Sequence, residues 1–134
     1  MLDYTSLRKA LASLVRAVDR SALAQTDDEL RDSAIQRFGY TYELCWKMLK
    51  RRLEEDAATP AEIDRMSFRE LLREGAARGL VADPSVWMHY RELRNLTAHT
   101  YDEAKADQVR QAIPAFQRDA AALLAAMAEG RGPD

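Results

Sequence analysis

Cysteine, glycine and proline are scarce in this sequence of 134 residues. It has one cysteine, five glycines and four prolines, whereas folds with many tight turns need glycine and proline at many positions. The single cysteine, Cys45, excludes a disulfide within the chain and favours a reducing compartment. Alanine, leucine, arginine and glutamate are abundant instead, and these residues favour helix. The composition therefore predicts an all-α fold.

Long apolar runs are also absent. Charged residues interrupt every apolar stretch, including the one that follows Met1, so neither a secretory signal nor a membrane span is predicted. We expect a cytoplasmic protein with no membrane contact. The formal net charge of −2 argues against a broad surface that coats nucleic acid, although Lys50, Arg51 and Arg52 form a small basic cluster. Any contact with RNA is therefore expected at a small site.

The length and the apolar content fit one domain with one core. Apolar residues make up 47% of the chain. We assign residues 1–128 to a single helical bundle and residues 129–134 to a frayed C-terminal tail. A chain of this size buries a modest fraction of its surface, so a leftover apolar face is predicted to form a homodimer.

Apolar residues at steps of three and four predict a four- to five-helix up-and-down bundle. Most helix starts carry residues that can cap free N–H groups, and some add proline or glutamate in the first turn. The expected helices begin near Asp3, Thr26 or Asp27, Ser67, Asp83 and Asp102, with a further short helical turn at Thr59. The second helix has apolar residues on more than one side, so we expect the dimer to form largely through it and the helix from Asp83.

A break in the helical pattern is predicted directly after His99. Thr100 and Glu103 have the spacing of a capping box, so the chain is expected to leave one helix there and to start the last one near Asp102. Pro114 is expected to kink that last helix. The break therefore places His99 at the end of a helix.

The segment from Arg94 to Tyr101 concentrates residues that can carry chemistry. The chain has two histidines and one asparagine, and Asn95 and His99 both lie in this segment. An arginine offers a planar fork of donors to phosphate oxygens, and an imidazole can exchange a proton near neutral pH. These groups suffice for RNA cleavage without a metal or cofactor, because the base deprotonates the 2′-hydroxyl and the cation stabilises the charge on the phosphate. The Asn95 amide can hold the phosphate or the imidazole.

Helix geometry and chance both limit this hypothesis. On an ideal helix Arg94 and His99 lie about 140° apart and roughly 7.5 Å along the axis. We therefore expect the helix to end near Ala98 and a two-fold axis to complete a composite cleft. With 16 arginines and two histidines, about one chain in four has an arginine five residues before a histidine by chance. On the pattern alone, a role for His99 in closing the helix is an equal alternative.

Other candidate residues have simpler interpretations. His89 has no acidic or thiol partner at metal-ligand spacing, so no metal site is predicted and His89 is expected at the surface or at an interface. Glu43 and Lys47 form a favourable pair one helical turn apart, which is typical of a solvated helix face. Three aromatic residues are expected in the core or in a dimer contact rather than in a base-stacking platform: Trp46, Trp87 and Tyr90.

Three blocks of this sequence resemble the nucleotidyltransferase substrate-binding proteins of the HEPN superfamily. They are residues 35–47, 67–70 and 87–103, and the last block contains the pattern Arg-Asn-x3-His-x-Tyr. The resemblance implies a dimeric helical bundle, encoded beside a minimal nucleotidyltransferase with which it forms a toxin–antitoxin pair. It also implies a metal-independent endoribonuclease, which is silenced when the partner enzyme transfers AMP to the tyrosine.

On this resemblance Arg94 and His99 are catalytic, Asn95 is auxiliary and Tyr101 is the AMP acceptor. A different class stays open, namely a non-catalytic subunit that binds nucleotide and scaffolds the nucleotidyltransferase. Relatives usually carry an acidic residue where this chain has Gly39, so any polar contact made there is expected to be missing. Within a helix, glycine also costs up to about 1 kcal/mol relative to alanine, unless close packing uses its small size.

Overall fold

The computed structural model describes residues 2–129, and within that range it contains helices and no strand. In chain order the elements are α1 (Thr5–Leu23), α2 (Asp28–Asp56), α3 (Pro60–Asp64), α4 (Phe68–Ala77), α5 (Pro84–Leu96), the 3-10 turn η1 (Thr97–His99) and α6 (Glu103–Glu129). The predicted all-α bundle is confirmed, and the short turn expected at Thr59 is the small helix α3. Glu129 ends α6, and the rest of the predicted tail lies outside the described residues.

Side-chain caps explain where several helices begin. The Asp27 carboxylate accepts hydrogen bonds from two backbone N–H groups in the first turn of α2. Ser67 and Glu70 form the predicted capping box of α4, and the Asp83 carboxylate accepts from the N–H of Ser85 at the start of α5. These three starts were predicted from the residue types alone.

Two predicted caps are wrong. Thr59 makes no side-chain hydrogen bond at the start of α3. At the start of α6 the capping side chain belongs to Asp102, which accepts from the N–H groups of Ala104 and Lys105, and not to Thr100. A carboxylate accepts such bonds with a full negative charge and interacts favourably with the positive end of the helix dipole, so Asp102 makes the better cap. The helix still begins where the sequence predicted.

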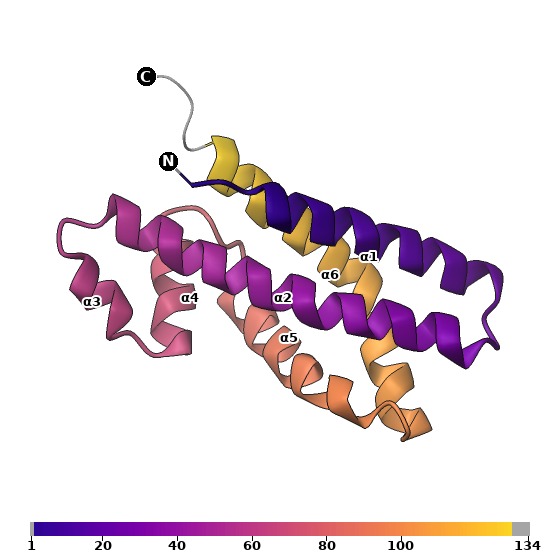
Figure 1. Ribbon diagram of the computed structural model, residues 1–134. Coiled ribbons are helices and arrows are strands. Elements are labelled where there is room, and N and C mark those ends of the chain that lie inside the picture. The colour runs from indigo at the N-terminus through magenta and orange to yellow at the C-terminus, as the bar shows by residue number, and fades with distance from the viewer. Residues whose placement is uncertain (1, 130–134) are drawn as a thin grey trace.

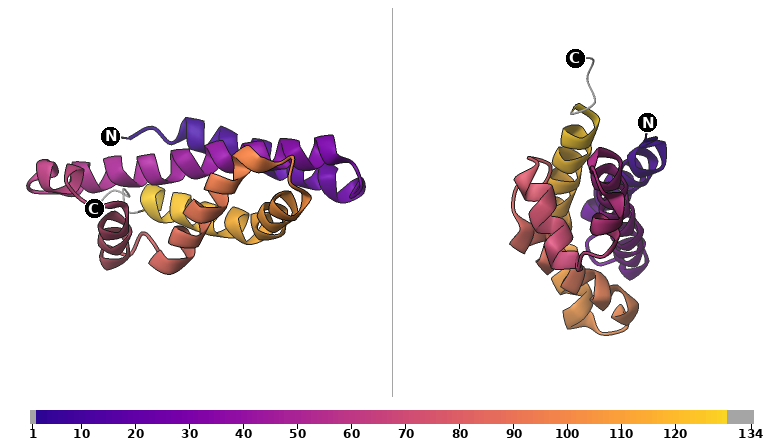
Figure 2. Two further views of the ribbon diagram at one scale, coloured as in Figure 1. Left: turned by 90° about the horizontal axis from the view of Figure 1, so that it is seen from below. Right: turned by 90° about the vertical axis from the view of Figure 1, so that its left-hand side faces the viewer.

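Long helices packed side by side form the frame of the molecule. Figures 1 and 2 show α1 and α2 lying antiparallel along most of their length, with α6 packed against both. The helix α5 crosses between α2 and α6, and α3 and α4 lie at the far end of α2. The turn η1 connects α5 to α6 and contacts α2. The long helix α2 therefore contacts each of the other helices, which is more than the two neighbours that its apolar residues on more than one side predicted.

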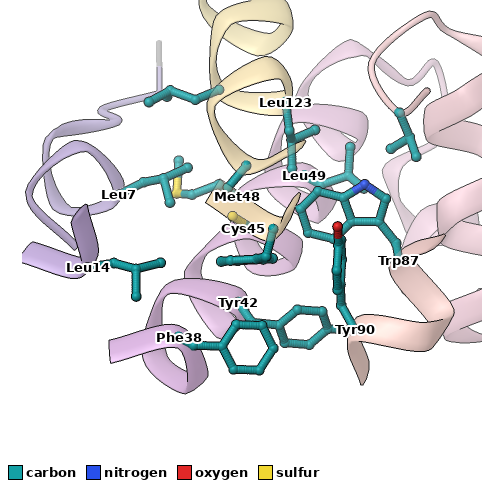
Figure 3. Packing of buried hydrophobic residues seen from close by; sticks show 14 of the residues in the cluster. Leu7, Leu14, Phe38, Tyr42, Cys45, Met48, Leu49, Trp87, Tyr90 and Leu123 are labelled. Atoms are coloured by element: carbon teal, nitrogen blue, oxygen red, sulfur yellow. The ribbon is translucent and has the colours of Figure 1, made fainter. Parts of the chain in front are cut away.

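Aromatic side chains fill the core between α2, α5 and α6. The Phe38 and Phe116 rings meet edge to face with centroids 4.8 Å apart, and Tyr42 stacks near Trp87 at 6.2 Å. Figure 3 shows Trp87 and Tyr90 of α5 pointing toward the same cluster. Both residues are buried, so of the two predicted locations, core or dimer contact, they occupy the core. Trp46, for which the same was predicted, is only partly buried. Cys45 is buried in the same cluster as Trp87 and Tyr90, and burial raises the pKa of its thiol, so it is a packing residue.

The predicted basic cluster at residues 50–52 does not form. Lys50 pairs with Asp64 of α3 at 2.7 Å. Arg52 is buried, where it pairs with Asp56 at 2.7 Å and donates to the backbone carbonyl of Met127 in α6. Successive residues of a helix point in directions about 100° apart, so three neighbouring cations do not share one face. Two of them hold the bundle together instead.

Two buried glycines give opposite predictions for stability. A Cβ at Gly39 of α2 would lie 3.7 Å from Thr97 Oγ1, an ordinary contact, whereas a Cβ at Gly75 of α4 would lie 2.8 Å from Val81 Cγ2. Gly39→Ala is therefore expected to raise the free energy of unfolding by about 0.5–1 kcal/mol, through helix propensity. Gly75→Ala is expected to lower it by about 1–3 kcal/mol through overpacking. Chemical denaturation followed by circular dichroism measures both free energies. A loss of stability in Gly39→Ala would show that the contact with Thr97 has no room for a methyl group.

Candidate functional site

The end of α5 and the turn after it hold the residues that were predicted to carry chemistry. The α-helix ends at Leu96, two residues before the expected end, and residues 97–99 form the 3-10 turn η1. The Thr97 hydroxyl donates to the carbonyl of Arg94 at 2.7 Å, and the N–H of Asp102 donates to the carbonyl of His99 at 3.0 Å. Both ends of the turn are thus fixed by hydrogen bonds.

An ion pair anchors the start of α6, directly after this turn. Arg31 of α2 is buried, and its Nη1 lies 2.6 Å from Glu103 Oε2 at the first residue of α6. The hydrogen bond with Glu103 raises the pKa of Arg31 above its ordinary value, so the pair stays charged. Arg31 also contacts Asp32 at 3.0 Å. The ion pair therefore ties the start of α6, four residues after His99, to α2.

His99 and Tyr101 form a pair at the surface. His99 Nδ1 lies 3.0 Å from the Tyr101 hydroxyl oxygen, and the two rings stand nearly perpendicular with centroids 5.7 Å apart. The Tyr101 side chain is 80% exposed. The pair has two hydrogen-bonded forms, because either the imidazole Nδ1–H donates to the phenol oxygen or the phenol O–H donates to Nδ1. The first form leaves the lone pair of Nε2 available to a substrate.

Arg94 pairs with Glu43 of α2. Arg94 Nε lies 2.8 Å from Glu43 Oε1, an ion pair that lacks the alignment of a hydrogen bond. The other carboxylate oxygen of Glu43 accepts a hydrogen bond from Trp46 Nε1 at 3.1 Å and lies 3.9 Å from Lys47 Nζ. The predicted pair of Glu43 and Lys47 is present and Lys47 is exposed, but Glu43 is half-buried between α2 and α5, so the expectation of a solvated face was wrong for Glu43. The Arg94 side chain extends from α5 to α2, where the Glu43 carboxylate orients its guanidinium.

Two hollows meet at Arg94 and Glu43. The larger one, which we call the α2–α5 pocket, has a volume of about 470 Å³, and its lining includes Trp46, Lys50, Phe68, Arg91 and Asn95 together with those two residues. The second, which we call the Gly39 pocket, has a volume of about 330 Å³, and its lining includes Gly39, Thr97 and Thr100 with the same two residues. Arg94 therefore stands between the two pockets.

The structure thus places the predicted site residues in two groups. Arg94 and Asn95 line the α2–α5 pocket, while His99 and Tyr101 form their own pair beyond the turn. Within residues 2–129, no hydrogen bond or ion pair joins Arg94 to His99. His89 is exposed and lies 3.8 Å from Glu92, as expected for a surface histidine.

Several residues of the site were missed by sequence reasoning. Glu43, Arg91 and Phe68 line the α2–α5 pocket; Glu43 was interpreted from the sequence only as part of a pair with Lys47, and no role at a site was predicted for any of the three. Glu43 carried one signal, since its position one turn before Trp46 allows the indole N–H to bond to a carboxylate. In the described part of the chain, no cluster of three or more histidine, cysteine or acidic side chains has the geometry to hold a metal ion. No helix in this range is both long and apolar enough to cross a bilayer.

Comparison with known proteins gives consistent matches over this fold. Residues 2–129 match the family model described as nucleotidyltransferase substrate binding protein like. A Haemophilus influenzae protein named probable ribonuclease HepT is 43% identical over 97 residues, which cover 72% of this chain. The match spans 66% of that relative, just under two thirds of its length.

Two solved structures share the fold. Haemophilus influenzae HI0074, described as the fold of a substrate binding domain of a nucleotidyltransferase, superposes with a TM-score of 0.86 and 37% identity, covering 93% of this chain and 98% of that one. A Thermus thermophilus protein superposes with a TM-score of 0.76 and 30% identity, covering 90% of this chain and 98% of that one. Because the family model matches all of the described residues, 2–129, this chain belongs to the nucleotidyltransferase substrate binding protein family.

Proposed function

We propose that this chain is the toxin of a toxin–antitoxin pair, a metal-independent endoribonuclease that is silenced when a cognate minimal nucleotidyltransferase transfers AMP to Tyr101. The observation that carries the proposal is the exposed pair of His99 and Tyr101, held at a fixed turn directly after the helix that bears Arg94. The name of the Haemophilus relative, probable ribonuclease HepT, supports the nuclease. The description of HI0074 supports a nucleotidyltransferase as partner.

The proposed chemistry needs one base and one cation. With its Nδ1–H donated to the Tyr101 oxygen, His99 can remove the proton of a 2′-hydroxyl at Nε2. The 2′-oxygen then attacks the adjacent phosphorus, and the bond to the 5′-oxygen breaks. The 5′-oxygen leaves as a hydroxyl with a proton from water, the imidazolium returns its own proton to solvent, and a 2′,3′-cyclic phosphate remains on the upstream fragment. Arg94 would stabilise the charge that builds on the phosphate, and Asn95 would donate to the same group.

A homodimer would complete this site. A single chain keeps Arg94 and His99 in separate groups, so the cation for one imidazole is proposed to come from the facing subunit. Half-buried apolar residues remain on the proposed contact helices, with Leu44 on α2 and Met88 and Leu96 on α5. Light scattering of the chain without its partner should give the mass of two chains, and a monomer at micromolar concentration would contradict the composite cleft.

One observation favours a second function, that of a non-catalytic subunit which binds nucleotide and scaffolds the nucleotidyltransferase. The charge of Arg94 is already paired with Glu43 at 2.8 Å. An arginine held in this way can bind a phosphate without ever meeting the imidazole that would cleave beside it. In this alternative the α2–α5 pocket binds nucleotide and His99 has no part in chemistry.

Incubation of the purified chain with cellular RNA in excess EDTA tests the proposal. We expect cleavage to continue, because neither group in the proposed chemistry is a metal ion, and we expect fragments that end in 2′,3′-cyclic phosphate. The ends can be identified by their resistance to a phosphatase that removes only open 3′-phosphates. RNA that is bound but stays intact would favour the scaffold function.

A further inference from the structure

We propose that the α2–α5 pocket receives one base of single-stranded RNA, the base next to the phosphate that Arg94 contacts. This inference rests on the proposed function, because it assumes that the chain's substrate is RNA. It adds a recognition site whose stacking side chains, Trp46 and Arg91, lie outside the Arg94–Tyr101 segment.

The size and the walls of the pocket suit a planar base. Its volume of about 470 Å³ falls within the range of small-molecule sites. The Trp46 and Phe68 rings stand at 89° to each other with centroids 5.9 Å apart. The Arg91 guanidinium lies over the Phe68 ring at 4.8 Å. An aromatic ring and a guanidinium plane are the surfaces on which unpaired RNA bases stack.

The charges of the pocket suit a polyanion. Three cationic side chains, Lys50, Arg91 and Arg94, and one acidic side chain, Glu43, line it. The excess of positive charge is local, since the chain as a whole has a net charge of −2. Lys50 is also paired with Asp64 on α3, so Arg91 and Arg94 are the cations best placed to meet a phosphate. An apolar protein segment would gain nothing from these groups.

The position of Arg94 supports an RNA strand over a free mononucleotide. Arg94 and Glu43 line both the α2–α5 pocket and the Gly39 pocket. A base in the first pocket would place its phosphate at Arg94, and the strand could continue through the Gly39 pocket past Thr97 and Thr100. Thr97 is the first residue of the turn that holds His99 and Thr100 directly follows it, so the strand would continue past this turn toward the proposed dimer cleft. A mononucleotide would leave the second pocket without a use.

Polar groups at the pocket give it the means to select among bases. Glu43 offers carboxylate oxygens that can accept from an exocyclic amine, and Asn95 offers both a donor and an acceptor. Stacking alone is tolerant of sequence, whereas hydrogen bonds to a base edge are selective. The fold thus provides affinity through Trp46 and Arg91, and selectivity through Glu43 and Asn95.

The test measures binding of RNA that cannot be cut. The probes are four fluorescein-labelled 2′-O-methyl hexanucleotides, each of a single base, which lack the 2′-hydroxyl nucleophile, and binding is followed by anisotropy. Trp46→Leu and Arg91→Gln are each expected to weaken the preferred hexanucleotide about tenfold. Arg51→Gln, which removes an exposed cation of α2 outside the pocket, serves as the matched control and should change the affinity less than about twofold. Arg91 is exposed, so its replacement tests the pocket even if Trp46→Leu is unstable.

Three results would overturn the inference. The first is equal binding by wild type and both pocket variants. The second is binding of AMP alone as tight as that of the hexanucleotide, which would make the pocket a mononucleotide site. The third is a dimer that becomes a monomer in Trp46→Leu, which would place a second copy in the pocket. A wild-type chain that cuts no RNA, yet loses hexanucleotide binding in Arg91→Gln, would refute the nuclease and leave the pocket assignment standing.

Discussion

Replacement of His99 by alanine is expected to lower the rate of RNA cleavage by about two to four orders of magnitude, because a positioned general base contributes a factor of that size. The side chain lies at the surface and makes its hydrogen bond only to the exposed Tyr101. Its loss should therefore leave the thermal unfolding of the chain almost unchanged. A loss of activity that came with a loss of stability would instead indicate a structural role in closing the helix.

His89→Ala is the matched control for this experiment. It removes the other histidine, which is exposed and lies on α5, the helix that precedes the turn with His99. Cleavage by His89→Ala should stay within about twofold of wild type, since its imidazole contacts only the neighbouring Glu92. If His99→Ala cuts RNA as fast as His89→Ala does, then His99 is not the general base and the nuclease assignment fails.

The fold was predictable because its signals are local and repeated. Capping residues such as Asp27 and Ser67 marked helix starts that the structure reproduces. Apolar residues spaced three and four positions apart predicted the buried face of α2. The errors lie where two local options compete. Thr100 and Asp102 could both cap α6. Asp102 caps it because its carboxylate is charged and lies directly before the first residue of the helix.

The site was predictable only in part, because its groups come from helices far apart in sequence. Arg94, Asn95, His99 and Tyr101 lie in one short segment whose composition drew attention. Glu43 lies some fifty residues earlier, and its pairing with Arg94 depends on how α5 crosses α2. A single sequence carries no direct signal of such a crossing. The same reason hid the α2–α5 pocket, which exists only once α2, α4 and α5 have packed.

Gly39 shows how a departure from the family pattern can be interpreted through packing. The family resemblance led us to expect an acidic residue there, and in this chain the position faces Thr97 with room for a small side chain. The Gly39 pocket occupies the space where a longer side chain would project. Arg94 pairs with Glu43 as its acidic partner. The Gly39 pocket lies open beside the same two side chains. The acidic side chains that line the Gly39 pocket are Asp32 and Glu43, and glycine at position 39 adds no third one.

Tyr101→Phe is expected to abolish AMP transfer to the chain by its cognate nucleotidyltransferase. In the transfer, the phenol oxygen attacks the α-phosphorus of ATP, a phosphodiester forms on the tyrosine and pyrophosphate leaves. Phenylalanine has no oxygen to attack, so the expected incorporation is zero. The wild-type side chain is 80% exposed, which leaves the hydroxyl accessible to the partner enzyme.

After incubation with partner and ATP, mass spectrometry should show added mass in multiples of one AMP on the wild-type peptide that contains Tyr101, and on no other peptide. Tyr40→Phe is the matched control, because Tyr40 is also exposed and should not affect the modification. Modification that maps to another residue, or that persists in Tyr101→Phe, would contradict the assignment.

The same variant should keep its toxicity when the partner is present. The added adenylate brings a negative charge and a large group to within reach of His99, whose Nδ1 lies 3.0 Å from the modified oxygen, so both charge and volume oppose RNA there. Tyr101→Phe loses only the hydroxyl partner of the imidazole, and its cleavage rate should stay within about tenfold of wild type, the scale of one neutral hydrogen bond. Cells that carry Tyr101→Phe with an active partner should therefore stop growing, while cells that carry wild type with the same partner should grow. If an active partner still rescues Tyr101→Phe and a catalytically dead partner does not, then silencing depends on AMP transfer to another site, and Tyr101 is not the switch.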